Sequence, residues 1–154
     1  MFELEQVCNE NMPHYSEYEK AFETDLKQYQ SRIYPSKSAE VLRWYHIKAD
    51  DRYIGAIWLE KNVDDDFAVL GIFIADELYR NKGTGKSAIE QIIKTDLQHM
   101  HTNKMLLRVR EENKRAIRCY KSVGFKENRR FRKNALNIIE MMYCKMEGNY
   151  EPKC

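Results

Sequence analysis

The sequence lacks a long apolar run. None of its apolar stretches approaches the ~20 residues of a membrane-spanning helix, which argues against a membrane protein. The first residues, Met1-Phe2-Glu3-Leu4-Glu5, are acidic and lack the basic-then-apolar order of a signal peptide. These two absences predict a cytoplasmic protein that has no membrane partner.

Cysteines are few and scattered, without a Cys-x-x-Cys pair. In a chain without an export signal this pattern predicts reduced thiols. It offers no ligand spacing for structural zinc, so we expect no metal site. The four cysteines are Cys8, Cys119, Cys144 and Cys154.

A glycine is missing where a nucleoside-triphosphate loop needs one. That motif is a glycine, four residues, then Gly-Lys-Ser/Thr, and Gly85-Lys86-Ser87 matches only its end. The first glycine would stand at position 80, which is Arg80, and an arginine side chain would crowd a loop wrapped around the β-phosphate. The sequence therefore does not favour a nucleoside triphosphatase.

A glycine-rich turn, however, follows the apolar run Phe67–Ala75 and precedes a helix-periodic segment. Backbone N–H groups at a helix N-terminus bind phosphate or pyrophosphate. Gly83 and Gly85 allow the backbone to approach the anion and to adopt φ > 0 where needed. Positive charge is added by Arg80, Lys82 and Lys86. The turn thus predicts a site for a phosphate-bearing molecule.

Two blocks together carry a family resemblance. Arg80-x-x-Gly83-x-Gly85 resembles the pyrophosphate loop of the GNAT superfamily of acyl-CoA-dependent N-acetyltransferases, which reads Arg/Gln-x-x-Gly-x-Gly/Ala. The superfamily's second signature is a strand, then Asn-x-x-Ala-x-x-x-Tyr on a short helix, then Gly-Phe. It is matched here by Asn113, Ala116, Tyr120, Gly124 and Phe125. The blocks span about residues 67–125, and the chain is identified on them as similar to this superfamily.

Length, periodicity and resemblance together predict the fold. A chain of 154 residues fits one domain, 1–154. We expect an α/β fold with a mixed, largely antiparallel sheet, two splayed central strands and helices on both faces. The expected strands are 2–7, 41–48, 53–60, 67–75, 105–110, 126–132 and 136–146, and the expected helices are 13–32, 86–100 and 113–122.

The resemblance implies acetyl-CoA as acyl donor, with its pantetheine arm between strands 67–75 and 105–110. An N–H near Ile74 or Ala75 would polarise the thioester carbonyl. Backbone groups of Lys82 through Lys86 would hold the pyrophosphate, helped by the helix dipole. The residues of this turn expected to bind the cofactor are Arg80, Asn81, Lys82, Gly83, Thr84, Gly85, Lys86 and Ser87. Residues 104–133 carry twelve bases against three acids, which indicates either a solvated basic face or a field that favours CoA. Few aromatic residues accompany these bases, so we expect no nucleic-acid partner.

The resemblance also suggests chemistry for the second block. Tyr120 matches the family's tyrosine and is our candidate general acid for the departing thiolate; alternatively it is a packed core aromatic. Asn113 either contacts the cofactor or caps its helix. Members acting on protein N-termini can carry a glutamate twelve residues before the tyrosine, but here that position is Arg108.

The general base is therefore open. The candidates are Glu111, Glu112, Glu140, His46 and a water relay. Arg108 at the site would favour an acceptor that carries a carboxylate. We expect the acceptor pocket to be lined by residues 13–35 and by the last hairpin.

The predicted function is transfer of an acetyl group from acetyl-CoA to a primary amine of a small molecule or protein. The alternative is a non-catalytic acyl-CoA-binding regulatory module. Dimers are common among proteins of this superfamily, so a homodimer is an open expectation.

Overall fold

The computed structural model describes residues 2–20, 32–75, 79 and 82–145. In this part of the chain, seven strands form one sheet in the order β1-β2-β3-β4-β5-β7-β6. The strands are β1 (Phe2–Gln6), β2 (Val41–Ala49), β3 (Arg52–Lys61), β4 (Ala68–Ile74), β5 (Lys104–Arg110), β6 (Lys126–Lys133) and β7 (Leu136–Cys144). The helices are η1 (Met12–Tyr15), α1 (Ser16–Glu19), α3 (Thr84–Thr95), η4 (Leu97–Met100) and α4 (Lys114–Val123).

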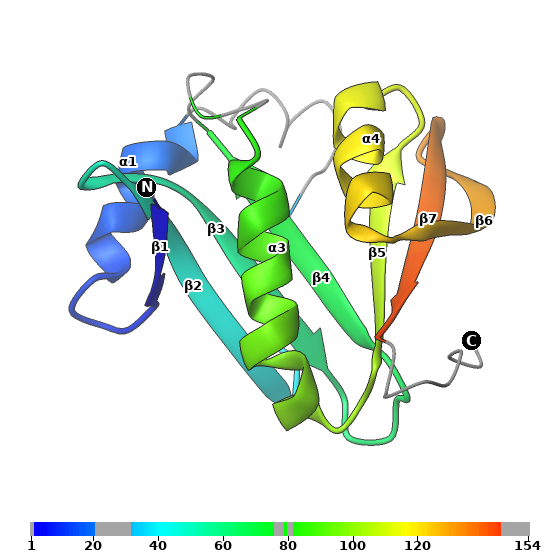
Figure 1. Cartoon of the computed structure of the whole chain (residues 1–154), viewed down its shortest axis with the longest axis horizontal. Helices are drawn as coiled ribbons and strands as arrows, with labels where there is room; N and C mark the ends of the chain where they lie inside the picture. Colours follow the sequence, from blue (N-terminus) through cyan, green and yellow to red (C-terminus); the bar gives the residue numbers. More distant parts are fainter. Residues whose placement is uncertain (1, 21–31, 76–78, 80–81, 146–154) are drawn as a thin grey trace.

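The sheet opens between its two central strands. The parallel ladder of β4 and β5 consists of two pairs, Ala68 with Met105 and Val69 with Leu106. Beyond them β4 stays paired with β3 as far as Ile74, while β5 stays paired with β7 as far as Arg110. The strands therefore diverge toward their C-terminal ends, as Figure 1 shows. The three remaining strand pairings, β1 with β2, β2 with β3 and β6 with β7, are antiparallel as well, so the predicted fold class is confirmed.

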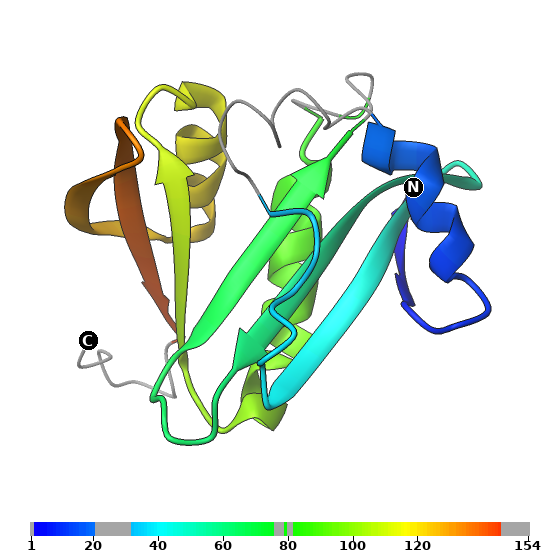
Figure 2. The ribbon, with the colours of Figure 1, turned by 180° about the vertical axis from the view of Figure 1, so that it is seen from behind.

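Helices cover both faces of the sheet. In Figure 1 α3 lies across β3 and β4, and α4 lies in front of β5 and β7. From behind, in Figure 2, α1 and the segment leading into β2 lie on the opposite face, and that segment crosses β3 and β4. Strand β3 is almost entirely buried because it is covered on both sides.

Two hairpins close with two-residue turns whose residues have positive φ. Asp50 and Asp51 join β2 to β3 with φ of 51° and 63°. Asn134 and Ala135 join β6 to β7 with φ of 50° and 64°. Turns of this hand match the twist of the strands they connect. The second turn places the end of β6 beside the opening between β4 and β5.

Two predicted helices need correction. Over 13–32 the structure has the 3-10 turn η1 followed by the short helix α1; residues 21–31 lie outside the described part. The predicted helix 86–100 is two elements: α3 begins earlier, at Thr84, and η4 follows it. Asp96 separates the two with φ of −118°, outside helical geometry. Leu97 and Met100 remain buried, so the tighter turn keeps the apolar contacts that the periodicity indicated.

Cys8 and Cys119 carry free thiols, as predicted. Cys144 is disulfide-bonded, so the expectation of a reduced thiol is wrong there. Among the described residues, no helix combines the length and apolarity that crossing a membrane requires.

Candidate active site

The glycine-rich turn leads directly into α3. Gly83 is the residue before the helix and has φ of 78°, a conformation that glycine adopts without steric cost. A Cβ atom built on Gly83 would meet no atom of the described residues beyond its chain neighbours within 4 Å, so this side of the turn is open among them. Lys82 and Ser87 are exposed there. The geometry fits the predicted phosphate site. Arg80 and Asn81 lie outside the described residues.

Gly85 brings three elements together. A Cβ on it would lie 3.6 Å from Ile74 Cδ1 and 3.7 Å from Cys119 Sγ. The first turn of α3 therefore packs close to both the end of β4 and α4. This approach makes one groove from the glycine-rich turn and the Asn-to-Tyr helix, which are far apart in the sequence.

Helix α4 is bounded by two residues of the second block. Asn113 Oδ1 accepts a hydrogen bond from the Ala116 N–H at 3.2 Å, so Asn113 caps the helix. Gly124 ends it with φ of 122°, and its N–H donates to the carbonyls of Tyr120 and Lys121. Phe125 then turns into the core, 2% exposed. The spacing of the block is thus that of a short, capped helix anchored by a buried ring.

A cavity of about 680 Å³ lies between the N-terminal half of α3 and α4. We call it the cofactor groove. Its lining residues are Ile72, Phe73, Ile74, Tyr79, Gly83, Gly85, Lys86, Ile89, Arg110, Glu112, Asn113, Arg115, Ala116, Arg118, Cys119, Tyr120 and Ser122. Among these described residues, four cations and one carboxylate, with an apolar floor along β4, fit a ligand that has anionic and uncharged parts.

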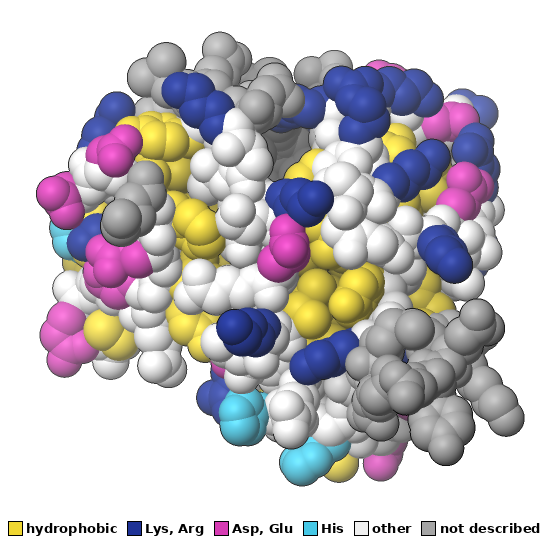
Figure 3. Space-filling model, in the orientation of Figure 1, with side chains coloured by type: hydrophobic (Ala, Val, Ile, Leu, Met, Phe, Trp, Pro, Cys, Tyr) yellow, Lys and Arg dark blue, Asp and Glu magenta, His cyan; other side chains and the backbone are white. Residues whose placement is uncertain are grey.

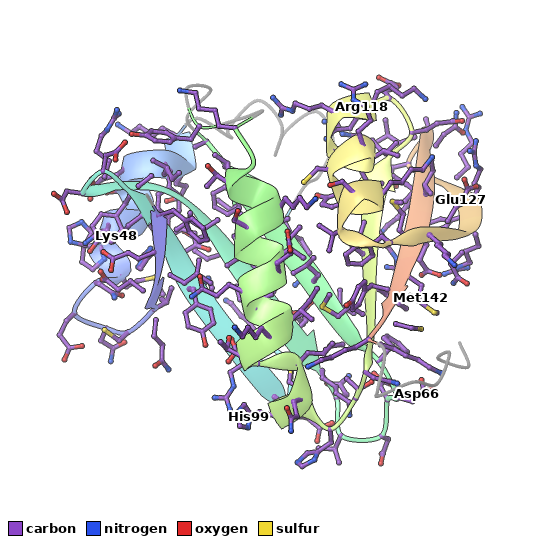
Figure 4. The ribbon with its side chains drawn as sticks, viewed as in Figure 1. Lys48, Asp66, His99, Arg118, Glu127 and Met142 are labelled. Atoms are coloured by element: carbon purple, nitrogen blue, oxygen red, sulfur yellow. The ribbon has the colours of Figure 1, made fainter. Side chains whose placement is uncertain are left out.

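The distribution of surface charge agrees with an anion-binding groove beside α4. Figure 3 shows Lys and Arg side chains gathered over α4 on the face that carries both helices. In Figure 4 Arg118 and Glu127 lie on the α4 and β6 side of the molecule, and Lys48 lies on the opposite side.

A second cavity, of about 350 Å³, lies on the opposite face of the sheet, and we call it the acceptor pocket. Strand alternation puts Trp58, Gly71 and Phe73 on one wall and Arg108 and Arg110 on the other. Its other lining residues are Arg32, Glu60, Val69, Leu70, Ile72, Leu107, Val109, Asn113, Tyr120, Phe131, Lys133, Asn134, Leu136 and Ile138. Of the segments expected to line the acceptor site, Arg32 and the last hairpin border this cavity, whereas Tyr15 and Tyr18 are buried core residues.

Tyr120 lines both cavities, together with Ile72, Phe73, Arg110 and Asn113. The opening between β4 and β5 therefore connects the two faces of the sheet. The Tyr120 ring packs edge-on against Phe125, with 6.0 Å between the ring centroids. Burial raises the pKa of Tyr120 well above its usual range, and Arg115 opposes only part of this shift. The phenol keeps its proton at neutral pH, as a general acid requires.

Arg108 is held at the edge of the acceptor pocket. Its Nε lies 3.6 Å from Glu140 Oε1, and its guanidinium lies over the Phe131 ring, 5.5 Å from the centroid. Arg129 occupies the other side of the same cluster, 2.9 Å from Glu140 Oε2 and 4.8 Å from the ring centroid. One carboxylate thus serves two guanidinium groups, and the cluster keeps a net positive charge.

Most of the candidate bases are engaged elsewhere. His46 is buried between the Tyr18 hydroxyl, 2.5 Å from Nδ1, and Asn11 Oδ1, 3.1 Å from Nε2. Glu140 bonds Asn128 and Arg129, whose hydrogen bonds lower the pKa of Glu140 against the effect of burial. His46 and Glu140 line neither cavity, and His46 is buried in the core. Glu111 pairs with Arg130 at 2.7 Å, and Glu112 lines the cofactor groove.

Glu60 was not foreseen. It is the one carboxylate among the described residues that line the acceptor pocket, and it is 6% exposed. Arg32 Nη2 donates to both its oxygens, at 2.7 and 2.9 Å, and the Ser36 N–H donates at 2.5 Å. Glu60 therefore fastens the segment that crosses β3 and β4. The alternation that puts Trp58 and Glu60 on one face of β3 is the sequence signal for it.

The Ala75 N–H donates to the Ile54 carbonyl at 2.8 Å and so belongs to the β3–β4 ladder. It is not available to a thioester carbonyl, which corrects the expectation for Ala75; a role for Ile74 stays a prediction. Within the described residues, no group of three or more His, Cys, Asp or Glu side chains could hold a metal ion.

Comparison with known proteins agrees with this architecture. The sequence model of the acetyltransferase (GNAT) family matches residues 4–125. The structure is similar to spermidine N-acetyltransferase from Vibrio cholerae in complex with CoA and spermine, with 16% identity and a TM-score of 0.74 over 93% of this chain and 95% of that one. It is also similar to the ribosomal-protein-S18-alanine N-acetyltransferase from Escherichia coli, with 19% identity and a TM-score of 0.71 over 99% and 100% of the two chains. No curated protein sequence matches the chain.

A family match over most of the chain shows the class: this protein belongs to the acetyltransferase (GNAT) family. It is an N-acetyltransferase of the GNAT type, and its acyl donor is acetyl-CoA. The family resemblance read from the two sequence blocks is confirmed.

Proposed function

We propose that this protein transfers the acetyl group of acetyl-CoA to a primary amine of a small molecule or a protein by direct attack in a ternary complex, with Tyr120 as general acid. The observation that carries the proposal is the pair of cavities on opposite faces of the sheet, which share Tyr120 at the opening between β4 and β5. Donor and acceptor can therefore be bound together, one on each face.

The cofactor groove is the proposed donor site. The backbone of residues 82–87 at the start of α3 would hold the pyrophosphate, with help from the helix dipole. Lys86, Arg115 and Arg118 would add charge for the phosphates. The apolar side chains of β4 would border the pantetheine arm, and the Asn113 cap keeps α4 in place against it. Bound acetyl-CoA supplies an activated thioester that a neutral amine can attack.

Tyr120 would act at the meeting point of the two cavities. The amine nitrogen forms a bond to the carbonyl carbon, the carbon–sulfur bond breaks, and the phenol gives its proton to the departing sulfur. The proton lost by the nitrogen leaves through water and restores the phenol. Glu60 is poorly suited to take this proton directly, because its oxygens already accept hydrogen bonds from Arg32 and Ser36. A water relay therefore suits the acceptor pocket better.

The test is release of CoA thiol from acetyl-CoA in the presence of amines, with CoA binding measured separately by calorimetry. Binding accompanied by amine-dependent thiol release supports the proposal. Binding without release from any of amino acids, polyamines, aminoglycosides or peptides would instead favour a non-catalytic acyl-CoA-binding module. If the protein neither binds CoA nor releases thiol, the result contradicts the donor site itself.

A further inference from the structure

The acceptor pocket carries an excess of positive charge among its described lining residues. Its described lining holds four cations and one carboxylate. Glu60 is bonded by Arg32, so this pair contributes no net charge. The remaining cations are Arg108, Arg110 and Lys133. A doubly or triply charged amine would meet like charges there, which are unfavourable in a partly enclosed site.

Arg108 is the best-placed of these cations to recognise an anion. Its side chain is 58% exposed, and its guanidinium is positioned by Glu140 on one side and the Phe131 ring on the other. The 3.6 Å contact to Glu140 is an ion pair without a short hydrogen bond. The planar N–H fork is thus oriented by the ion pair and the ring, and no described residue accepts a hydrogen bond from it. An oriented fork of this kind can bind a carboxylate with two parallel hydrogen bonds.

The opposite wall is apolar. Trp58 is 3% exposed and its indole lies across Gly71, where a Cβ atom would be 2.1 Å from the ring. Phe73 continues this wall toward the opening that Tyr120 lines. The pocket therefore presents an aromatic wall, a guanidinium on the facing strand and the candidate acid at its inner end.

We infer that the acceptor is an amine that carries a carboxylate, with Arg108 as the residue that determines this specificity. The inference rests on the proposed function and adds the chemical class of its acceptor. The carboxylate binds the Arg108 fork, the apolar part of the acceptor lies against Trp58 and Phe73, and the amine points toward the opening between β4 and β5. The source of the carboxylate is a small amino acid or an acidic peptide, because both present the same group.

Matched acceptor pairs test this inference. Each pair differs only in a carboxylate: 5-aminopentanoate and 5-aminopentanamide, glycylglycine and glycylglycinamide, and the peptide amides Ala-Asp-Gly and Ala-Asn-Gly. The acid is several bonds from the reacting amine, so amine basicity stays nearly equal within a pair. Thiol release gives kcat/KM for each, and spermidine serves as a cationic acceptor. We expect the acid to exceed its amide by about 10- to 100-fold in at least one pair, as for a hydrogen-bonded charge pair.

Two arginine variants separate recognition from structural damage. Arg108→Ala should reduce the acid-to-amide ratio to about one, and Arg108→Lys should leave an intermediate ratio because it keeps the charge but loses the fork. Arg129→Ala is the matched control, since Arg129 shares Glu140 and Phe131 with Arg108 but does not line the pocket. It should keep the wild-type ratio.

Equal kcat/KM for acid and amide in every pair would overturn the inference. It would also be overturned if spermidine were the best acceptor, or if Arg108→Ala and Arg129→Ala lowered the acid-to-amide ratio equally. The proposed function fails differently: CoA binds, and thiol is released with none of these acceptors or those of the wider amine panel.

Discussion

The cofactor groove and the acceptor pocket lie on opposite faces of one sheet and are built in contrasting ways. The groove comes from two compact blocks, the turn before α3 and the helix α4, whose functional groups include backbone N–H groups and helix ends. The pocket comes from single side chains on β3, β4, β5 and the β6–β7 hairpin. The difference teaches that the proposed donor site depends on backbone shape, while the proposed acceptor site depends on which side chains meet across the opening.

Tyr120→Phe tests the point where the two regions meet and should have the largest effect. The variant keeps the ring that packs on Phe125 and removes the acidic proton, so kcat should fall by about 10²- to 10⁴-fold, the usual contribution of a general acid. Calorimetry should show nearly unchanged CoA affinity. A kcat within a factor of three of the wild type would mean that Tyr120 is only a packed aromatic.

Gly83→Val should damage the groove and leave the pocket intact. A β-branched residue at φ of 78° costs about 1–3 kcal/mol in backbone strain, which corresponds to roughly 10- to 100-fold weaker CoA binding if the turn changes shape. CoA titration and acceptor KM at saturating acetyl-CoA check it. Weaker acceptor binding with normal CoA affinity would contradict the division between the two regions.

Gly71→Ala is the complementary change in the pocket. The new Cβ would lie 2.1 Å from the Trp58 indole, so the ring must move, and overpacking of this kind costs about 1–3 kcal/mol. We expect a lower Tm, a several-fold higher acceptor KM and an unchanged Kd for CoA. Thermal unfolding, calorimetry and steady-state kinetics measure the three. A loss of CoA affinity equal to the loss of acceptor affinity would show that the two sites are not separable.

The pH profile should show the smallest effect, because burial raises the pKa of Tyr120. A general acid works in its protonated form, so activity is present below its pKa and lost above it. An ordinary tyrosine would begin to lose its proton near pH 10. Here kcat should not decline as pH rises from about 7 to 10. A Tyr120-dependent alkaline decline below pH 9 would contradict the acid assigned to this residue.

How well the sequence predicts a structural feature depends on how far apart in the chain the interacting residues lie. The strands and the splay at 67–75 and 105–110 follow from apolar patterning and the family resemblance, and they are confirmed. The long helices were less well predicted, because Asp96 interrupts the periodicity that Leu97 and Met100 continue. The competing interpretation of Asn113 as a helix cap is confirmed by its bond to Ala116, whereas cofactor contacts by Asn113 stay a prediction.

The acceptor side was the least predictable. Arg108 stood out only because it occupies a position where relatives can carry a glutamate, and Glu60 gave no motif at all. His46 was a reasonable candidate base by residue type, yet Tyr18 and Asn11 hold it in the core. Sequence spacing places such residues on strands, but it does not say which strands separate or which side chains are already bonded.

The sequence by itself determined the family, the glycine turn before a helix and the positions of the strands along the chain, because these depend on local backbone preferences and on short, spaced motifs. Only the tertiary structure decided that Tyr120 lines both faces of the sheet, that Glu60 is bonded by Arg32 and that Arg108 presents an oriented guanidinium to the acceptor pocket. These arrangements arise where residues distant in the chain compete for the same partners, and that competition is settled only when the strands are in place.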